Sequence, residues 1–173
     1  MNLQSTDFEL FDVPERFAQD ADALQARWKA LQRQVHPDRF AAQGAAAQRM
    51  AAQWSARVNE AYRRLKNPLQ RAAYLCEING QGIDAERNTA MPAAFLERQM
   101  QLREALENAE HPDALQAIET EFTSMSQQAF SSLARQIDEQ QDWLAAAQTV
   151  RALMFLDKFG TELARRRATD ARH

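Results

Sequence analysis

Apolar residues recur at three- and four-residue intervals along most of this 173-residue chain. That spacing is typical of amphipathic helices, because it places the apolar side chains on one face. With only 4 glycines and 5 prolines, the chain is also poor in the residues that β-turns need. Hydrophobic residues make up 45% and charged residues 26%, as in ordinary folded proteins. We therefore predict an all-α fold.

The composition excludes several classes of function. The single cysteine, Cys76, excludes an internal disulfide and a cysteine-based metal cluster, and its apolar neighbours predict a buried residue. The histidines, His36, His111 and His173, do not have the spacing of metal ligands, and there is no glycine-rich phosphate loop. No apolar run approaches the ~20 residues of a membrane span. We expect a cytoplasmic protein with no metal, no cofactor and no membrane partner.

Charge divides the chain into two parts. Residues 1–79 carry a net charge of +2 and residues 80–173 a net charge of −5. The two parts meet at the segment 79–82, which holds two of the four glycines. We predict an N-terminal domain over 1–79, a linker over 80–90 and a C-terminal domain over 91–173.

Two apolar stripes in the N-terminal part predict a helical hairpin. The first predicts a helix over about 20–35, ended by Pro37, because the residue before a proline avoids the helical conformation. A loop through Gly44 and a second helix over about 45–66 follow, and the two helices should pack antiparallel. Pro68 begins a further short helix. The stripes consist of Leu24, Trp28, Leu31 and Val35, and of Met50, Trp54, Val58, Ala61 and Leu65.

Three further stripes in the C-terminal part predict a three-helix bundle. The first helix begins near Met91-Pro92. The second covers about 115–137 and the third about 146–163. The turn between these two falls near 138–142, where no glycine or proline marks it.

The most informative short motif is His36-Pro37-Asp38, which follows the first long helix. A catalytic interpretation makes His36 and Asp38 an acid–base pair, but no nucleophile is recognisable nearby. A structural interpretation makes the tripeptide a helix stop followed by a turn. The tripeptide alone leaves both interpretations open.

A one-sided basic strip leads to this motif. Lys29 and Arg33 lie one turn apart, opposite the apolar stripe, and Arg39 directly follows the motif. A solvated helix face would account for these charges, but so would a docking surface for an acidic partner. Nucleic acid is a poorer partner, because the net charge is −3 and no base-reading helix is recognisable.

Together these features resemble a J-domain: a basic helix, the tripeptide, an antiparallel second helix and the segment NPLQRAAY at 67–74. The resemblance implies stimulation of ATP hydrolysis by a DnaK-like chaperone, so the protein would be an adaptor and not an enzyme. Arg39 occupies a position where lysine is frequent, which keeps the charge but changes the hydrogen-bond geometry. The residues implied to contact the chaperone are His36, Pro37, Asp38, Arg39, Lys29 and Arg33.

Over nearly its whole length the chain resembles the HscB family, the J-domain co-chaperones of iron–sulfur cluster assembly. The matching segments are LQRQVHPDRF at 31–40, AFLE at 94–97, LRE at 102–104, TVR at 149–151 and FLDK at 155–158. No zinc-binding cysteine module is present, so we expect a bacterial-type member. The resemblance implies two partners, an HscA-type ATPase chaperone and an IscU-type scaffold protein that is delivered to it.

Helical geometry indicates a separate surface for the client. If Phe95 faces the bundle, steps of 100° per residue place Leu96 to the side and Met100 and Glu104 away from the core. Phe155 likewise lies outside the stripe of its helix. Single exposed apolar residues are common, and packing between domains would also cover them. The resemblance implies that this surface binds the scaffold through Leu96, Met100 and Phe155, with Glu104 and Arg151 as its polar border.

Two other functions remain open. One is a J-domain adaptor for a different client, which a pull-down through residues 88–173 that recovers no cluster scaffold would favour. The other is a small helical enzyme that uses His36 and Asp38. Turnover by the isolated chain, without any ATPase, would support the enzyme.

Overall fold

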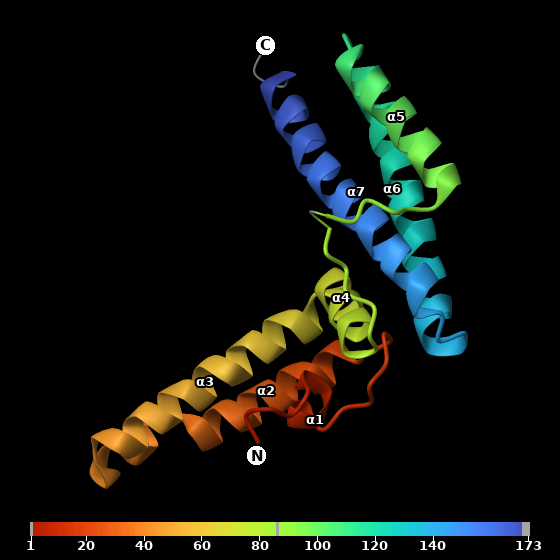
Figure 1. Cartoon of the computed structure of the whole chain (residues 1–173). Coiled ribbons are helices and arrows are strands. Elements are labelled where there is room, and N and C mark those ends of the chain that lie inside the picture. The colour runs from red at the N-terminus through yellow and green to blue at the C-terminus, as the bar shows by residue number, and fades with distance from the viewer. Residues whose placement is uncertain (1, 86, 171–173) are drawn as a thin grey trace. The chain divides into compact units, whose positions relative to one another are not determined.

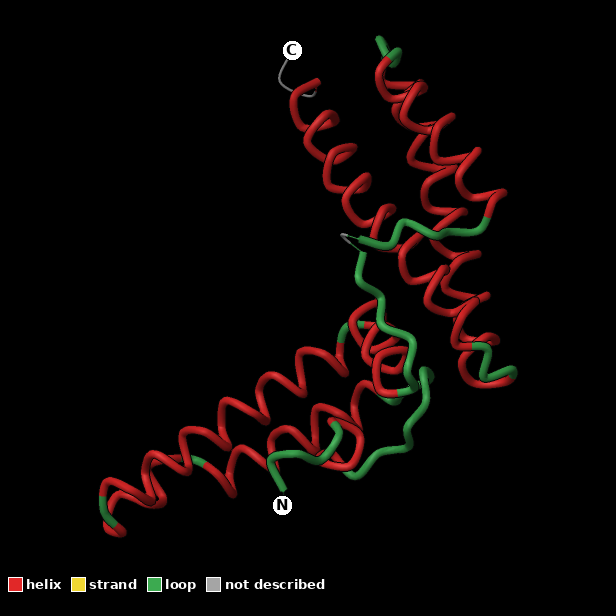
Figure 2. Tube along the Cα trace, in the orientation of Figure 1, coloured by secondary structure: helices red, strands yellow, loops and turns green. Residues whose placement is uncertain are grey.

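A computed structural model describes residues 2–85 and 87–170, so His173 lies outside the described residues. These residues form helices joined by connections of varied length, and no strand occurs among them (Figures 1 and 2). The all-α prediction is confirmed. The chain divides into two compact units, Met1–Leu75 and Cys76–His173. The division falls within α4 (Pro68–Ile78), so the last turn of this helix belongs with the second unit.

The N-terminal unit is built on an antiparallel hairpin of α2 (Ala21–Val35) and α3 (Ala45–Lys66), which lie side by side (Figure 1). Asp20 caps α2, because its carboxylate accepts the N–H groups of Asp22 and Ala23. Both helices lie where the apolar stripes predict them. The buried members of the stripes are Leu24, Leu31, Val35, Val58, Ala61 and Leu65.

One member of the second stripe is not in the core. Met50 was expected to face the first helix but is 51% exposed. The reason is length, since α3 has 22 residues and α2 only 15. The first turns of α3 therefore extend past the end of α2, and the side chain of Met50 is left exposed there.

The connection between α2 and α3 is more regular than the predicted loop. Pro37–Gln43 form a 3-10 helix, η1, which packs against α3. Pro37 suits the first position of a helix, where a backbone N–H would have no partner. Gly44 has a φ of +92°, a conformation that favours glycine, and leads into α3. The predicted loop is therefore a 3-10 helix over residues 37–43.

A buried carboxylate fixes α1 (Asp7–Phe11) on α3. Asp7 is fully buried, and its oxygens lie 2.8 Å from Arg57 Nη1 and 2.6 Å from Arg64 Nε. Its N–H donates to the hydroxyl of Tyr74 at 3.0 Å. The hydrogen bond from Arg64 to Asp7 raises the pKa of Arg64, and burial raises the pKa of Tyr74. A buried charge needs such partners, so α1 is held in one place.

The second unit is a bundle of α5 (Ala93–Glu107), α6 (Pro112–Ala134) and α7 (Trp143–Asp170), as predicted (Figure 1). α6 packs along α7, and α5 packs chiefly on α6. Gly160 allows α7 to approach α6 closely, since a Cβ at this position would lie 2.7 Å from Phe122 Cζ. Buried core residues of the bundle include Leu102, Leu106, Leu115, Ile118, Met125, Leu133, Val150, Leu153, Leu156, Phe159 and Leu163.

The turn between α6 and α7 needs neither glycine nor proline. Arg135–Glu139 form a turn of π-helix, η2, and Gln141 has a left-handed φ of 51°. Asp142 then caps the start of α7, because its Oδ1 accepts the N–H of Ala145 at 3.1 Å. The left-handed conformation of Gln141 and the capping carboxylate of Asp142 thus form a turn for which glycine would be the usual residue.

Candidate partner-binding sites

The His36-Pro37-Asp38 tripeptide lies exposed where α2 ends and η1 begins. His36 and Asp38 have side chains that are 54% and 90% exposed, with Nδ1 of the imidazole 3.4 Å from Oδ2 of the carboxylate. His36 Nδ1 accepts the N–H of Asp38 at 3.3 Å, which caps η1. In the neutral imidazole the proton is then on Nε2, which is left to donate to a partner.

The predicted basic residues surround this tripeptide. Lys29, Arg33 and Arg39 are exposed, and none of the ion pairs found among the described residues includes them. Arg39 folds back on α2, where its Nη1 donates to the carbonyl of Arg33 at 2.7 Å. A shallow hollow of about 490 Å³ lies between Gln32, Arg33, His36 and Arg39. Lys29 lies one turn earlier and does not line it. The result is an exposed basic surface beside the tripeptide.

The described part of the chain offers little for nucleophilic or metal chemistry. Cys76 is buried, as predicted, and burial raises the pKa of its thiol to about 11. No three His, Cys, Asp or Glu side chains among the described residues come together to hold a metal ion. None of the described helices is long and apolar enough to cross a membrane.

The second unit presents an apolar ridge, which we define as Leu96 and Met100 on α5 with Phe155 on α7; Glu104 of α5 lies at its border. Leu96 is 39% and Met100 70% exposed, and Glu104 is exposed beside them. Phe155 is half-buried. Its ring makes an edge contact with Phe95, with the centroids 5.9 Å apart. This contact joins α5 to α7 at the ridge.

Sequence reasoning missed Arg103, which belongs to this surface. Its guanidinium carbon lies 5.1 Å from the centroid of the Phe155 ring, a cation–π geometry. Arg103 follows Leu96 by seven residues, and two helical turns put both on one face of α5. That spacing is the signal that could have found it.

Arg151 differs from its predicted place at the polar border. Its side chain is only 4% exposed. Nε donates to the carbonyl of Ile83 at 2.9 Å and Nη1 to that of Ala90 at 3.1 Å. These bonds hold the guanidinium against the backbone of the linker, where it is shielded from solvent. Of the two predicted border residues, only Glu104 is exposed.

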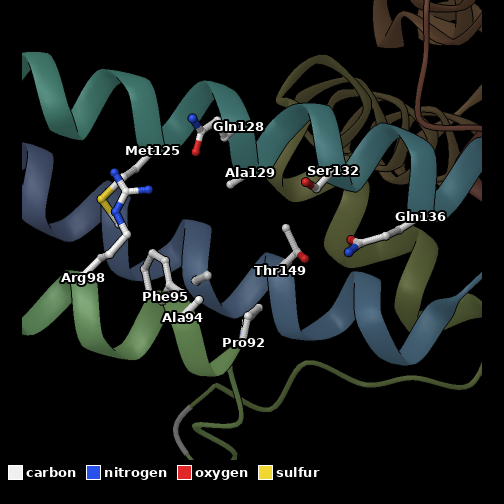
Figure 3. A pocket seen from close by; sticks show the side chains of 11 residues that line it. Pro92, Ala94, Phe95, Arg98, Met125, Gln128, Ala129, Ser132, Gln136 and Thr149 are labelled. Atoms are coloured by element: carbon white, nitrogen blue, oxygen red, sulfur yellow. The ribbon is translucent and has the colours of Figure 1, made fainter.

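A cleft of about 380 Å³ lies between the first turns of α5 and the α6–α7 pair (Figure 3). Phe95 and Met125 contribute to its apolar wall, and Gln136 and Thr149 to its polar end. Gln136 Oε1 is buried there without a hydrogen-bond partner among the described residues. None of the predicted site residues lines the cleft. It marks the end of the bundle where α5 covers α6 and α7 incompletely.

Comparison with known proteins agrees with this arrangement. Residues 91–164 match the family described as the HSCB C-terminal oligomerisation domain. The co-chaperone protein HscB homolog of Bordetella avium (strain 197N) is 48% identical over 158 residues, 91% of this chain and 94% of that protein. The homolog of Paraburkholderia xenovorans (strain LB400) is 44% identical over 165 residues, 94% of each chain.

Two solved structures match the fold. Chaperone HscB from Vibrio cholerae has a TM-score of 0.87 at 39% identity, covering 95% of this chain and 99% of that one. Human co-chaperone protein HscB has a TM-score of 0.88 at 26% identity, covering 96% of this chain and 84% of that one.

A helical hairpin with an exposed His-Pro-Asp turn, followed by a three-helix bundle, defines a J-domain co-chaperone. The Bordetella avium relative matches over 94% of its length, and the Vibrio cholerae structure shares the fold over 99% of its chain. The chain belongs to the HscB family of co-chaperones. The family resemblance expected from the sequence is therefore confirmed.

Proposed function

We propose that this protein stimulates ATP hydrolysis by an HscA- or DnaK-type chaperone in the cytoplasm and delivers an IscU-type scaffold protein to it. In this role it would support the maturation of iron–sulfur proteins. The observation that carries the proposal is the exposed His-Pro-Asp turn. Its basic neighbours, Lys29, Arg33 and Arg39, form no ion pair within the described part of the chain. The exposed apolar ridge of the second unit supports the client part of it.

The chaperone-binding surface acts through the exposure of its tripeptide and the positive charge of its basic residues. Lys29, Arg33 and Arg39 attract an acidic surface of the chaperone and speed its encounter. Once it is bound, His36 Nε2 and the Asp38 carboxylate are free to make directional hydrogen bonds with the ATPase. Preferential binding to one conformation of the chaperone shifts its equilibrium toward the state that hydrolyses ATP.

The client-binding part acts through apolar burial. Leu96 and Met100 offer exposed aliphatic surface, and Phe155 offers a half-buried aromatic ring, the kind of anchor on which binding energy concentrates. Glu104 and Arg103 border this surface with opposite charges, which selects the orientation of the scaffold. One chain that holds both partners raises the effective concentration of client at the chaperone.

The chaperone part is tested by His36→Gln, with ATPase rates of the cognate chaperone measured with and without scaffold. We expect stimulation to be lost while scaffold affinity, measured by calorimetry, is unchanged. His111→Gln is the matched control, because His111 is an exposed histidine at the start of α6. Full stimulation by His36→Gln would contradict the proposal.

The client part is tested by replacing Leu96, Met100 and Phe155 together with alanine. We expect scaffold affinity to fall at least about tenfold, roughly 1.4 kcal/mol, while stimulation without scaffold survives. Leu144→Ala is the control, since Leu144 is 59% exposed and lies on α7, about 16 Å along the axis from Phe155. Unchanged affinity in the triple variant would place the client site elsewhere.

A further inference from the structure

Arg151 is a buried cation whose hydrogen bonds within the described part of the chain go to backbone carbonyls. None of the ion pairs among the described residues includes it. Besides the bonds to Ile83 and Ala90, Nη2 lies 3.5 Å from the carbonyl of Gly82. Removing a guanidinium from water is costly unless its donors are bonded. The side chain of Arg151 can therefore be buried only because these carbonyls accept hydrogen bonds from its N–H groups.

The acceptors all lie in the linker between α4, which ends at Ile78, and α5, which begins at Ala93. Carbonyl groups in such a segment have no regular ladder and need other donors. Arg151 supplies donors at two places, near Ile83 and at Ala90. One side chain of α7 thus holds the linker at both points, and Ile83 is itself buried.

The second attachment lies close to the start of α5. Ala90 lies three residues before Ala93, the first residue of α5. α5 packs chiefly on α6, and the cleft shows that its first turns are incompletely supported. Its aromatic and cation–π contacts with α7 both involve Phe155, which follows Arg151 by one helical turn. The linker attachment and the ridge therefore occupy adjacent turns of α7.

From this we propose that Arg151 is a positioning residue: by holding Ile83 and Ala90 on α7, it places the start of α5 so that Leu96 aligns with Phe155. The inference rests on the proposed scaffold-binding function of the ridge. Without these bonds the first turns of α5 are free to shift, and ordering them again upon binding lowers affinity for the scaffold.

The variants Arg151→Met and Arg151→Lys test this in the full chain. Methionine keeps an unbranched apolar stem without donors, and lysine keeps the charge without the planar fork. We expect faster amide hydrogen exchange in residues 83–96, unchanged exchange in the centre of α6, and scaffold affinity lowered about tenfold by Arg151→Met and less by Arg151→Lys.

A double-mutant cycle separates positioning from general destabilisation. If Arg151 acts through the ridge, Arg151→Met lowers affinity much less when Phe155→Ala is already present. Arg166→Met is the matched control, because Arg166 also lies on α7 and donates to a backbone carbonyl, that of Ala109, about 16 Å along the helix axis from Phe155. It should leave scaffold affinity unchanged.

The outcomes distinguish this inference from the proposed function. If Phe155→Ala alone leaves affinity unchanged, the proposed client site fails. If Phe155→Ala weakens binding but Arg151→Met does not, or if the two effects simply add, the positioning role fails and the client site stands. Loss of helical circular dichroism in both Arg151 variants would also overturn the positioning role, in favour of a purely structural one.

Discussion

The guanidinium carbon of Arg103 lies 5.1 Å from the centroid of the Phe155 ring, so a cation of α5 covers an aromatic side chain of α7. An exposed contact of this kind contributes about 0.5–1 kcal/mol. We expect Arg103→Ala to weaken scaffold binding about two- to fivefold, as measured by calorimetry. Arg98→Ala is the control, because Arg98 pairs with Glu121 at 3.0 Å. An equal effect of both substitutions would argue against a specific role for Arg103.

Asp7→Asn should destabilise the N-terminal unit strongly. The change leaves Arg57 and Arg64 without their buried carboxylate, and such losses cost about 3–5 kcal/mol. Urea unfolding followed by tryptophan fluorescence measures the free energy of unfolding. Asp12→Asn provides the comparison, since Asp12 is 87% exposed and lies 3.9 Å from Arg27. Asp12→Asn should lower the free energy of unfolding by less than about 1 kcal/mol. Equal losses in the two variants would show that burial of Asp7 with its arginines is unimportant.

Cys76 should make stability fall in alkaline solution. Burial raises its pKa in the folded chain to about 11, whereas an unfolded thiol ionises near 8.5. Between these values the folded state binds more protons, so the free energy of unfolding decreases as pH rises. Cys76→Ala should flatten this decrease in urea titrations between about pH 8 and pH 10. The raised pKa of Tyr74 acts in the same direction, so part of the slope remains. Identical slopes in both proteins would refute the prediction.

Gly160→Ala should destabilise the bundle although alanine favours helices. The added Cβ would lie 2.7 Å from Phe122 Cζ, and overpacking of this kind costs about 1–3 kcal/mol. The higher helix propensity of alanine stabilises the folded chain by only about 1 kcal/mol. Thermal unfolding of the full chain measures the balance. Gly82→Ala serves as control, because nothing lies within 4 Å of a Cβ there, and a melting temperature of Gly160→Ala above the parent's would contradict the clash.

The helices of the hairpin were predictable because their signals are local. The apolar stripes and Pro37 placed α2 within a residue of its observed start, and α3 over its observed range. The 3-10 helix after Pro37 was not predictable in the same way, because η1 has no buried residue and therefore no apolar periodicity. Met50 was misplaced because a stripe does not reveal how far the partner helix extends.

The ridge was only partly predictable. Leu96 and Met100 are exposed as helical geometry requires, since their position relative to the core follows from spacing alone. Arg103 and Arg151 are both arginines within helices, yet one covers an exposed ring and the other is buried. Spacing places Arg103 on the face of Leu96, but the burial of Arg151 depends on where the linker runs.

By itself, the sequence determined the helices, their order and the exposed tripeptide, because helix periodicity and the missing N–H of proline act between neighbours in the chain. Tertiary structure alone decided the hydrogen bonds of buried charged groups to partners far away in the chain. Asp7 meets Arg64 across 57 residues, and Arg151 meets Ile83 across 68. Such pairings depend on which backbone carbonyls and carboxylates the folded chain brings together in a space without water, and no local pattern encodes that.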